Sequence, residues 1–168
     1  AAKSPGDGYT LLLAPVSPMA INVSLYGDKL KFNPEKDFTP LTLIAKVPLV
    51  LAIHPNVPVR NVKQFIALAK ARPGKLTYGS SGVGSSLHLS AELLKLLAKI
   101  DIVHVPYKGV VAPMTATSTG EVAIASAGIA SAMPFIKSGK VKPIALSSRK
   151  RSASLYFGLT SRSTIRPG

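Results

Sequence analysis

The sequence predicts an α/β protein in which strands and helices alternate and the strands form a sheet with parallel neighbours. From residue 55 onward, short apolar runs alternate with longer helical patterns, which is typical of βαβ units. Within that region a strand-like run passes through a glycine- and serine-rich turn into a leucine-rich helical pattern, over residues 76–98. The chain is also 46% apolar, which excludes a disordered protein.

The N-terminal part of the chain is less regular. Asp7 and Gly8 form a turn signal before a strand-like run over residues 9–14. Prolines interrupt the section that follows, which we expect to be loop or short helix as far as residue 34. Residues 41–45 and 49–53 are predicted strands around Pro48, and a proline there suits a sheet edge, a bulge or a crossing between two sheets.

The later elements follow from capping and breaking signals. Asn61 is the predicted N-cap of a helix to about residue 71, with Gln64 as its capping-box partner and Pro73-Gly74 as the stop. Beyond it we expect strand 76–79, helix 85–98, strand 102–105, helix 112–119, strand 122–125, helix 129–137 and strand 142–146.

The helix predicted over residues 85–98 has a clear apolar stripe. Its small and large apolar residues recur at helical spacing, with Leu87, Ala91, Leu94 and Ala98 along the stripe and Leu93 and Leu97 widening it. Lys95 and Lys99 are expected on the opposite side. The stripe therefore predicts packing against the core and not contact with a cofactor.

The loop before this helix carries the clearest functional signal. Its residues are Gly79, Ser80, Ser81, Gly82, Val83, Gly84, Ser85 and Ser86. Glycines can adopt positive φ, so the loop can direct several N–H groups one way, and Ser85 or Ser86 suits the N-cap. The free N–H groups of the helix start favour an anion. We expect a carboxylate, phosphate or sulfate site, and the alternative is a tight turn whose glycines serve geometry alone.

The loop does not match the glycine-rich motifs of better-known nucleotide or hydrolase sites. Gly79 and Gly84 have the spacing of a Walker A loop, but Ser85 stands where that motif has lysine. A dinucleotide fingerprint would need a third glycine, where Leu87 stands. A nucleophile elbow would need glycine in place of Val83. A nucleotide hydrolase is therefore not predicted.

The charge balance suggests a surface that attracts small anions. The chain has 21 Lys and Arg against 7 Asp and Glu, a formal net charge of +14. The basic residues are scattered singly except for one cluster at residues 149–151, and the five Tyr and five Phe do not interleave with them. Such a distribution argues against a nucleic-acid partner and fits steering of small anions.

No catalytic, metal or membrane site is predicted. The chain has no cysteine, and His54 and His104 lack a second ligand at metal spacing. His88 follows the loop but is expected to be structural. The carboxylates do not form an acid–base pair with a nucleophile, and no apolar run is long enough to cross a bilayer. We expect no cofactor and no direct membrane insertion.

Motifs in order along the chain resemble one family. They are DGYTLLL at residues 7–13, YGSSGVGSSLH at 78–88, VPYKG at 105–109 and IKSGK at 136–140. Over roughly residues 5–148 the chain resembles the substrate-binding receptors of tripartite tricarboxylate transporters, the Bug family. The resemblance implies a type II periplasmic-binding-protein-like fold of two lobes with mixed sheets. It also implies a fragment with lobe one incomplete: residues 1–46 partial lobe one, 47–141 lobe two, and 142–168 a return strand toward lobe one with an irregular tail.

The same resemblance implies a periplasmic receptor that closes on a di- or tricarboxylate and delivers it to membrane subunits of a transporter, without enzymatic activity. It places the loop of residues 79–86 on a ligand carboxylate, Val16 and Ser17 near the hinge, and Tyr107 at the cleft edge. Ala127 stands where family members commonly carry an acidic residue. Two alternatives stay open: the effector-binding lobe of a transcription regulator, and an α/β enzyme acting on an anionic substrate.

Overall fold

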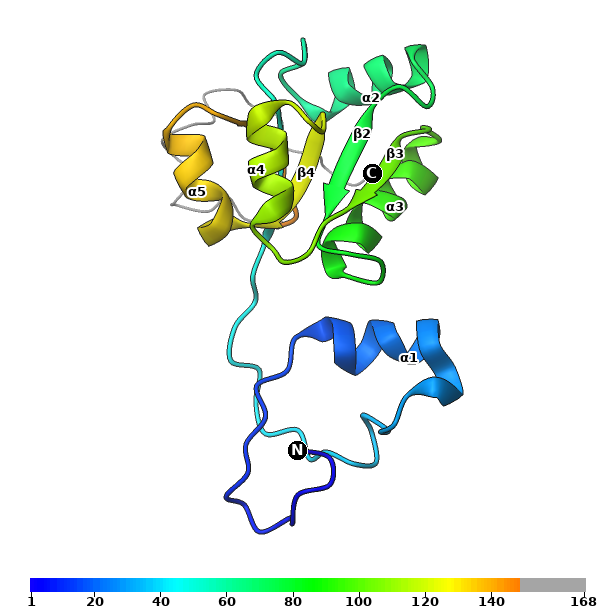
Figure 1. Ribbon diagram of the computed structural model, residues 1–168, viewed down its shortest axis with the longest axis vertical. Coiled ribbons are helices and arrows are strands. Elements are labelled where there is room, and N and C mark those ends of the chain that lie inside the picture. The colour runs from blue at the N-terminus through cyan, green and yellow to red at the C-terminus, as the bar shows by residue number, and fades with distance from the viewer. Residues whose placement is uncertain (149–168) are drawn as a thin grey trace. The chain divides into compact units, whose positions relative to one another are not determined.

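The computed structural model describes residues 1–148, and the chain divides into two compact units (Figure 1). Within the described residues, one unit comprises residues 1–46 together with 84–86, and the other comprises residues 47–83 and 87–148. The irregular tail expected at the C-terminus lies, from residue 149 onward, outside the described residues.

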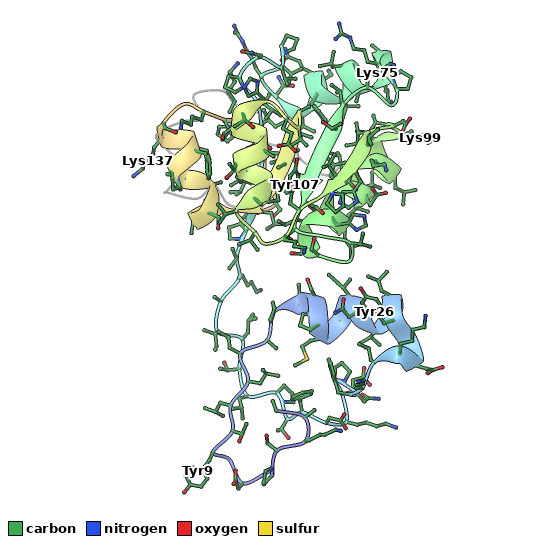
Figure 2. The ribbon with its side chains drawn as sticks, in the orientation of Figure 1. Tyr9, Tyr26, Lys75, Lys99, Tyr107 and Lys137 are labelled. Atoms are coloured by element: carbon green, nitrogen blue, oxygen red, sulfur yellow. The ribbon has the colours of Figure 1, made fainter. Side chains whose placement is uncertain are left out.

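The N-terminal unit is helical and irregular. It contains η1 (Ser17–Ile21), α1 (Asn22–Tyr26) and η2 (Gly27–Lys29), as expected for the proline-interrupted section. The strands predicted at 9–14 and 41–45 are wrong, because no described residue before Leu49 lies in a strand. An apolar run becomes a strand only beside another strand, and here Tyr9 is 92% exposed (Figure 2).

The second unit is built on a five-stranded sheet with the order β3-β2-β4-β1-β5. Its strands are β1 (Leu49–Ile53), β2 (Thr77–Ser80), β3 (Val103–Pro106), β4 (Ile124–Gly128) and β5 (Lys142–Leu146). β2 pairs in parallel with β3 and with β4, whereas β1 runs antiparallel to β4 and β5. The expected parallel pairing thus holds for β2, β3 and β4, and the sheet as a whole is mixed.

Helices cover both faces of this sheet (Figure 1). They are α2 (Val62–Ala71), α3 (Ser86–Ala98), α4 (Ala112–Thr119) and α5 (Ile129–Lys137). Phe65 of α2 and Ala91 of α3 share one buried cluster with Ile124 of β4. Met114 of α4 shares the other cluster with Ala125, the next residue of β4. Successive strand residues point to opposite faces, so α2 and α3 cover one face and α4 and α5 the other.

The first and last strands of the sheet lie side by side where the chain enters and leaves it. Pro48 immediately precedes β1, so it interrupts no ladder. The Ser147 N–H donates to the Leu49 carbonyl at 2.9 Å, and the Leu49 N–H donates to the Ser147 hydroxyl at 2.8 Å. Backbone and side chain together close the sheet at this end.

The N-terminus of α2 confirms the predicted cap with one difference. The Asn61 side chain accepts from the Gln64 N–H at 2.9 Å, as expected. The Gln64 side chain accepts from the Arg60 N–H at 2.7 Å, one residue before the position that a capping box uses. The cap therefore satisfies the N–H groups on both sides of Asn61.

The faces of α3 differ from the sequence prediction. Ala91 is buried and Leu94 packs against the core, as expected. Leu93 and Leu97, which the sequence pattern assigned to the stripe, are 54% and 75% exposed. Lys95, expected opposite the core, is half-buried and bonds to Glu92 at 2.9 Å. Leu87 is buried and Ala98 packs against the core as well, so the central stripe is retained. The Tyr78 hydroxyl on β2 gives Glu92 a polar partner beside it.

Candidate functional site

The glycine- and serine-rich loop lies at the carboxyl edge of the parallel strands. It leaves β2, the middle strand of the parallel trio, and enters α3 at Ser86. α3 covers one face of the sheet, whereas α5, which follows the neighbouring β4, covers the other. In open α/β sheets, ligands bind outside the carboxyl ends of the strands where successive connections diverge in this way. The loop therefore occupies the edge at which ligand binding is expected.

The three glycines of the loop have two different functions. Gly82 has φ 111° and Gly84 has φ 78°, a backbone region that disfavours side chains. Gly79 does not need positive φ. A Cβ there would lie 3.2 Å from Cβ of Pro113 and 3.3 Å from side-chain atoms of Tyr107 and Val122. Gly82 and Gly84 shape the loop, and Gly79 allows close packing under it.

The hydroxyl of Ser80 points into the protein, and the expectation that it faces a ligand is therefore corrected. Ser80 is fully buried, and its Oγ lies 2.7 Å from Nε2 of His104. The same oxygen accepts from the Gly82 N–H at 3.2 Å and lies 3.3 Å from the Gly82 carbonyl oxygen. Ser80 thus fixes the start of the loop from inside the protein.

The structure gives the exposure and the position of other loop residues. Val83 is 64% exposed at the tip. Because α3 begins at Ser86, Ser85 occupies the N-cap position that the sequence predicted. Contact of Ser81, Val83, Ser85 and Ser86 with a ligand stays a prediction.

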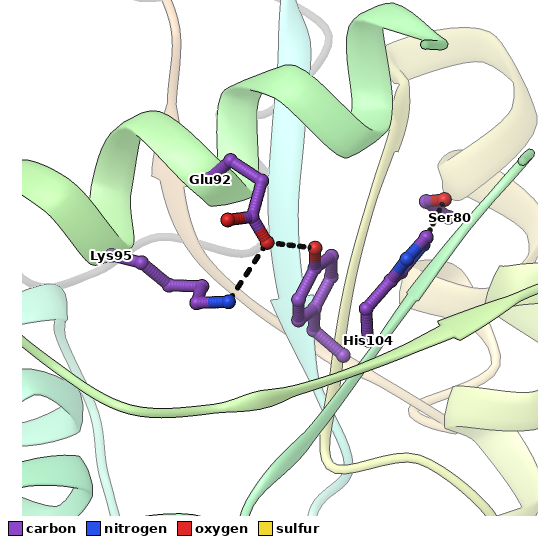
Figure 3. A network of polar contacts seen from close by, with 5 residues as sticks. Ser80, Glu92, Lys95 and His104 are labelled. Atoms are coloured by element: carbon purple, nitrogen blue, oxygen red, sulfur yellow. Dashed lines mark hydrogen bonds and ion pairs between the residues drawn. The ribbon is translucent and has the colours of Figure 1, made fainter. Parts of the chain in front are cut away.

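A polar network that the sequence did not predict lies beside the loop (Figure 3). The Tyr78 hydroxyl donates to the Glu92 carboxylate, which also accepts from Nζ of Lys95 at 2.9 Å. The His104 ring stacks on Tyr78, with centroids 4.8 Å apart, and lies 4.4 Å from the His88 ring. Tyr78 and Ser80 lie on one face of β2, and His104 on β3 is the register partner of Tyr78. α3 and two strands therefore meet in one network.

The network shifts the ionisation of its members. Burial raises the pKa of Tyr78, and the bond to Glu92 raises it further, so the phenol stays protonated. Burial lowers the pKa of His104, and the neighbouring His88 lowers it further. Burial alone would raise the pKa of Glu92, but the bonds from Tyr78 and Lys95 outweigh it and lower the pKa overall. The resulting state is a neutral His104 beside an ionised Glu92.

Tyr107 serves the packing under the loop. Its N–H donates to the Ser80 carbonyl at 2.8 Å, and its hydroxyl donates to Glu121 at 2.7 Å. Burial and the Glu121 bond raise its pKa to about 12. The ring lies against Gly79 and the hydroxyl is bonded to Glu121, and the predicted contact of Tyr107 with a ligand stays a prediction.

The remaining predicted site residues lie elsewhere. Ala127 is fully buried and packs in the cluster under α4 and α5, and its predicted contact with a ligand stays a prediction. Val16 and Ser17 belong to the N-terminal unit, where Ser17 opens η1, and their part in binding stays a prediction. Among residues 1–148, no group of three His, Asp or Glu side chains could hold a metal ion.

The helices of the described chain are short compared with the thickness of a bilayer. Through residue 148, none combines the length and the apolar character that a membrane span requires.

Comparisons with known proteins agree on one family. The family model described as "Tripartite tricarboxylate transporter family receptor" matches residues 1–157. Protein BugT of Bordetella pertussis is 34% identical over 152 residues, which cover 90% of this chain and 46% of BugT. The chain thus spans about half the length of the curated relatives it matches.

Solved structures give the same result. The chain superposes on a protein described as a periplasmic transporter with a TM-score of 0.84 and 38% identity, covering 92% of this chain and 51% of that one. R. palustris Rpa4515 with adipate gives a TM-score of 0.81 and 35% identity, and the match covers 89% of this chain and 50% of that one. MatC from Rhodopseudomonas palustris with bound malate gives a TM-score of 0.76 and 28% identity, and the match covers 88% of this chain and 50% of that one. The mixed α/β fold is therefore that of periplasmic binding proteins of this type.

Proposed function

This chain belongs to the receptor family of tripartite tricarboxylate transporters, and from that premise we propose that it binds a small organic anion without altering it. The observation that carries the proposal is the position of the loop over residues 81–85. Two positive-φ glycines turn its backbone at the carboxyl edge of the parallel strands, directly before α3. Main-chain N–H groups at such a position favour negative charge.

The proposed ligand class is a dicarboxylate or tricarboxylate. Two structural neighbours were solved with adipate and with malate, and both molecules carry carboxylates at the two ends of a short chain. One carboxylate would accept hydrogen bonds from N–H groups of the loop. Val16 and Ser17 are further proposed contacts of the ligand.

The proposed setting is the periplasm, where the protein would release its ligand to the membrane subunits of a transporter. Binding would proceed by closure about a hinge, which excludes water from the ligand and strengthens each polar contact. The formal net charge of +14 would assist by drawing anions to the surface.

A binding role is favoured over an enzymatic one by the burial of Ser80. Ser80 and His104 form a hydrogen-bonded pair of the type that activates a nucleophile. However, Ser80 is fully buried, and the carboxylate of the same network, Glu92, bonds to Tyr78 and Lys95. The pair therefore supports the loop instead of attacking a substrate.

The proposal is tested by calorimetric titration of the full-length natural protein with adipate and with malate. Gly82→Val and Gly84→Val are expected to abolish binding, because a β-branched side chain is strongly disfavoured at positive φ. Gly139→Val is the matched control, since Gly139 also has positive φ, at 70°, but follows α5, where an added Cβ would meet no atom within 4 Å. Thermal unfolding of each variant separates loss of binding from loss of fold.

Two results would contradict the proposal. One is normal affinity in both loop variants, which would place the ligand elsewhere. The other is turnover of a bound carboxylate by the wild-type protein, which would favour an enzyme.

A further inference from the structure

The start of the loop is held by a side chain from the neighbouring strand. His104 lies on β3, directly beside Tyr78 in the parallel register. Its Nε2 lies 2.7 Å from the buried Ser80 hydroxyl, which accepts in turn from the Gly82 N–H at 3.2 Å. A continuous hydrogen-bonded path therefore leads from β3 through Ser80 to the first positive-φ glycine of the loop.

His104 itself has little freedom to move. Its ring stacks on Tyr78 at an interplanar angle of 18° and lies 4.4 Å from the His88 ring on α3. Tyr78 is in turn held by Glu92 through its hydroxyl. The imidazole is thus clamped from the strand and from the helix, and its orientation toward Ser80 is determined by both.

The hydrogen bonds of Ser80 can be completed in either arrangement of the protons. If Nε2 accepts, the Ser80 hydroxyl donates to it while Oγ accepts from the Gly82 N–H. If Nε2 donates, the hydroxyl can turn to the Gly82 carbonyl, 3.3 Å away. In both arrangements Oγ holds Gly82, so the contact does not depend on one tautomer of His104.

We propose that His104 is a positioning residue, which acts through Ser80 to hold Gly82 and the loop in the form that binds the anion. The inference rests on the proposed function for its consequence, since a preorganised loop loses less conformational freedom on binding. Its structural part, the coupling of His104 to the Gly82 amide, stands on the contacts alone.

The structural part is tested by amide hydrogen exchange in the full-length natural protein. His104→Ala and Ser80→Ala should each make the Gly82 N–H exchange roughly three- to tenfold faster, the factor that one ordinary hydrogen bond supplies. The double variant should be no faster than the single ones, because both remove the same path. His104→Gln should restore much of the protection, since an amide side chain can also bond to Ser80.

His54→Ala serves as the matched control. His54 is a half-buried histidine whose Nδ1 accepts from the Asn56 N–H at 3.3 Å, within its own turn. Its removal should leave exchange at Gly82 unchanged. Unchanged exchange at Gly82 in both His104→Ala and Ser80→Ala would overturn the inference.

The functional part is tested by titrating the same variants with adipate and malate. His104→Ala should weaken binding by a factor similar to its effect on Gly82 exchange, and His104→Gln should recover it. Faster exchange with unchanged affinity would overturn the role in binding. If the wild-type protein binds neither anion, the proposed function fails for these ligands, whereas the exchange experiment still decides whether His104 holds the loop.

Discussion

The Tyr78 hydroxyl donates to the Glu92 carboxylate and ties the middle of β2 to α3. The bond joins a residue that is 1% exposed to a carboxylate that Lys95 also contacts at 2.9 Å. Glu92 and Lys95 therefore lie beside the apolar stripe of α3 and have polar partners there. The polar contact adds to the packing of Ala91 and Leu94 in holding α3 against the sheet.

Tyr78→Phe should lower the free energy of unfolding by about 1 kcal/mol. A hydrogen bond to a charged group contributes more than a neutral one, but partial exposure of Glu92 reduces the effect here. Urea unfolding measures the change. Tyr9→Phe is the control, because Tyr9 is 92% exposed and should give no measurable change. An equal effect of the two substitutions would contradict the assignment.

Stability should fall as the solution becomes acidic through the range of histidine titration. His104 has a lowered pKa because of burial and then the neighbouring His88. The unfolded chain therefore binds this proton more readily, so the contribution of His104 is complete above about pH 6.5 and lost as pH falls through its folded pKa. Lys95 opposes protonation as well, and Glu92 favours it.

Glu92 gives a second decline at lower pH, since its pKa is also lowered overall. Urea unfolding from about pH 7.5 to about pH 2 should show both declines, because the Glu92 contribution is lost only below the pKa of an unfolded glutamate, about 4.3. His104→Gln should remove the first and retain the second. An unaltered pH profile in that variant would show that His104 does not titrate as described.

Gly79→Ala should destabilise the fold by about 1–3 kcal/mol, as overpacking of a filled core does. The new methyl would approach Pro113, Tyr107 and Val122 within 3.2–3.3 Å. The cost comes from packing, because Gly79 does not have positive φ. Gly6→Ala is the control, since a Cβ at Gly6 meets nothing within 4 Å. Chemical unfolding of both variants checks the difference, and a neutral Gly79→Ala would show that Tyr107 can move aside.

Leu94→Ala and Leu97→Ala distinguish the two faces of α3. Leu94 packs against the core, so its truncation should cost about 1–3 kcal/mol, below the range of a fully buried leucine. Leu97 is 75% exposed, and its truncation should change stability by less than about 0.5 kcal/mol. Both residues lie on α3 and both are changed from leucine to alanine, so the effect of helix propensity on stability is the same in the two variants. A loss for Leu97 as large as that for Leu94 would show that Leu97 widens the buried stripe, as the sequence pattern predicted.

Much of the second unit could be predicted from local signals. The helices at 112–119 and 129–137 and the strand at 142–146 begin and end as the sequence predicted. The strand predicted at 122–125 begins before the observed β4, because the N–H groups of Glu121 and Val122 still donate to the Ala116 carbonyl at the end of α4. Helix breakers and caps act within a few residues of the boundary that they set, so such boundaries can be predicted from the local sequence.

The errors involve contacts between residues distant in the sequence. Residues 9–14 and 41–45 have strand-like patterns, but a strand also needs a partner that the pattern does not contain. The network of Tyr78, Glu92 and His104 depends on the register of β2 with β3 and on the rotation of α3. For the same reason, the role of Ser80 inside the protein and of Tyr107 under the loop could not be foreseen from a glycine-rich motif.

β1 and β5 bring the two ends of the described sheet to one place, where Leu49 and Ser147 bond to each other. A folded module whose ends are neighbours can be joined to a host at a single surface turn without stretching either partner. The described sheet therefore begins and ends at one place, and a joint made there would need to connect only two adjacent points of the chain.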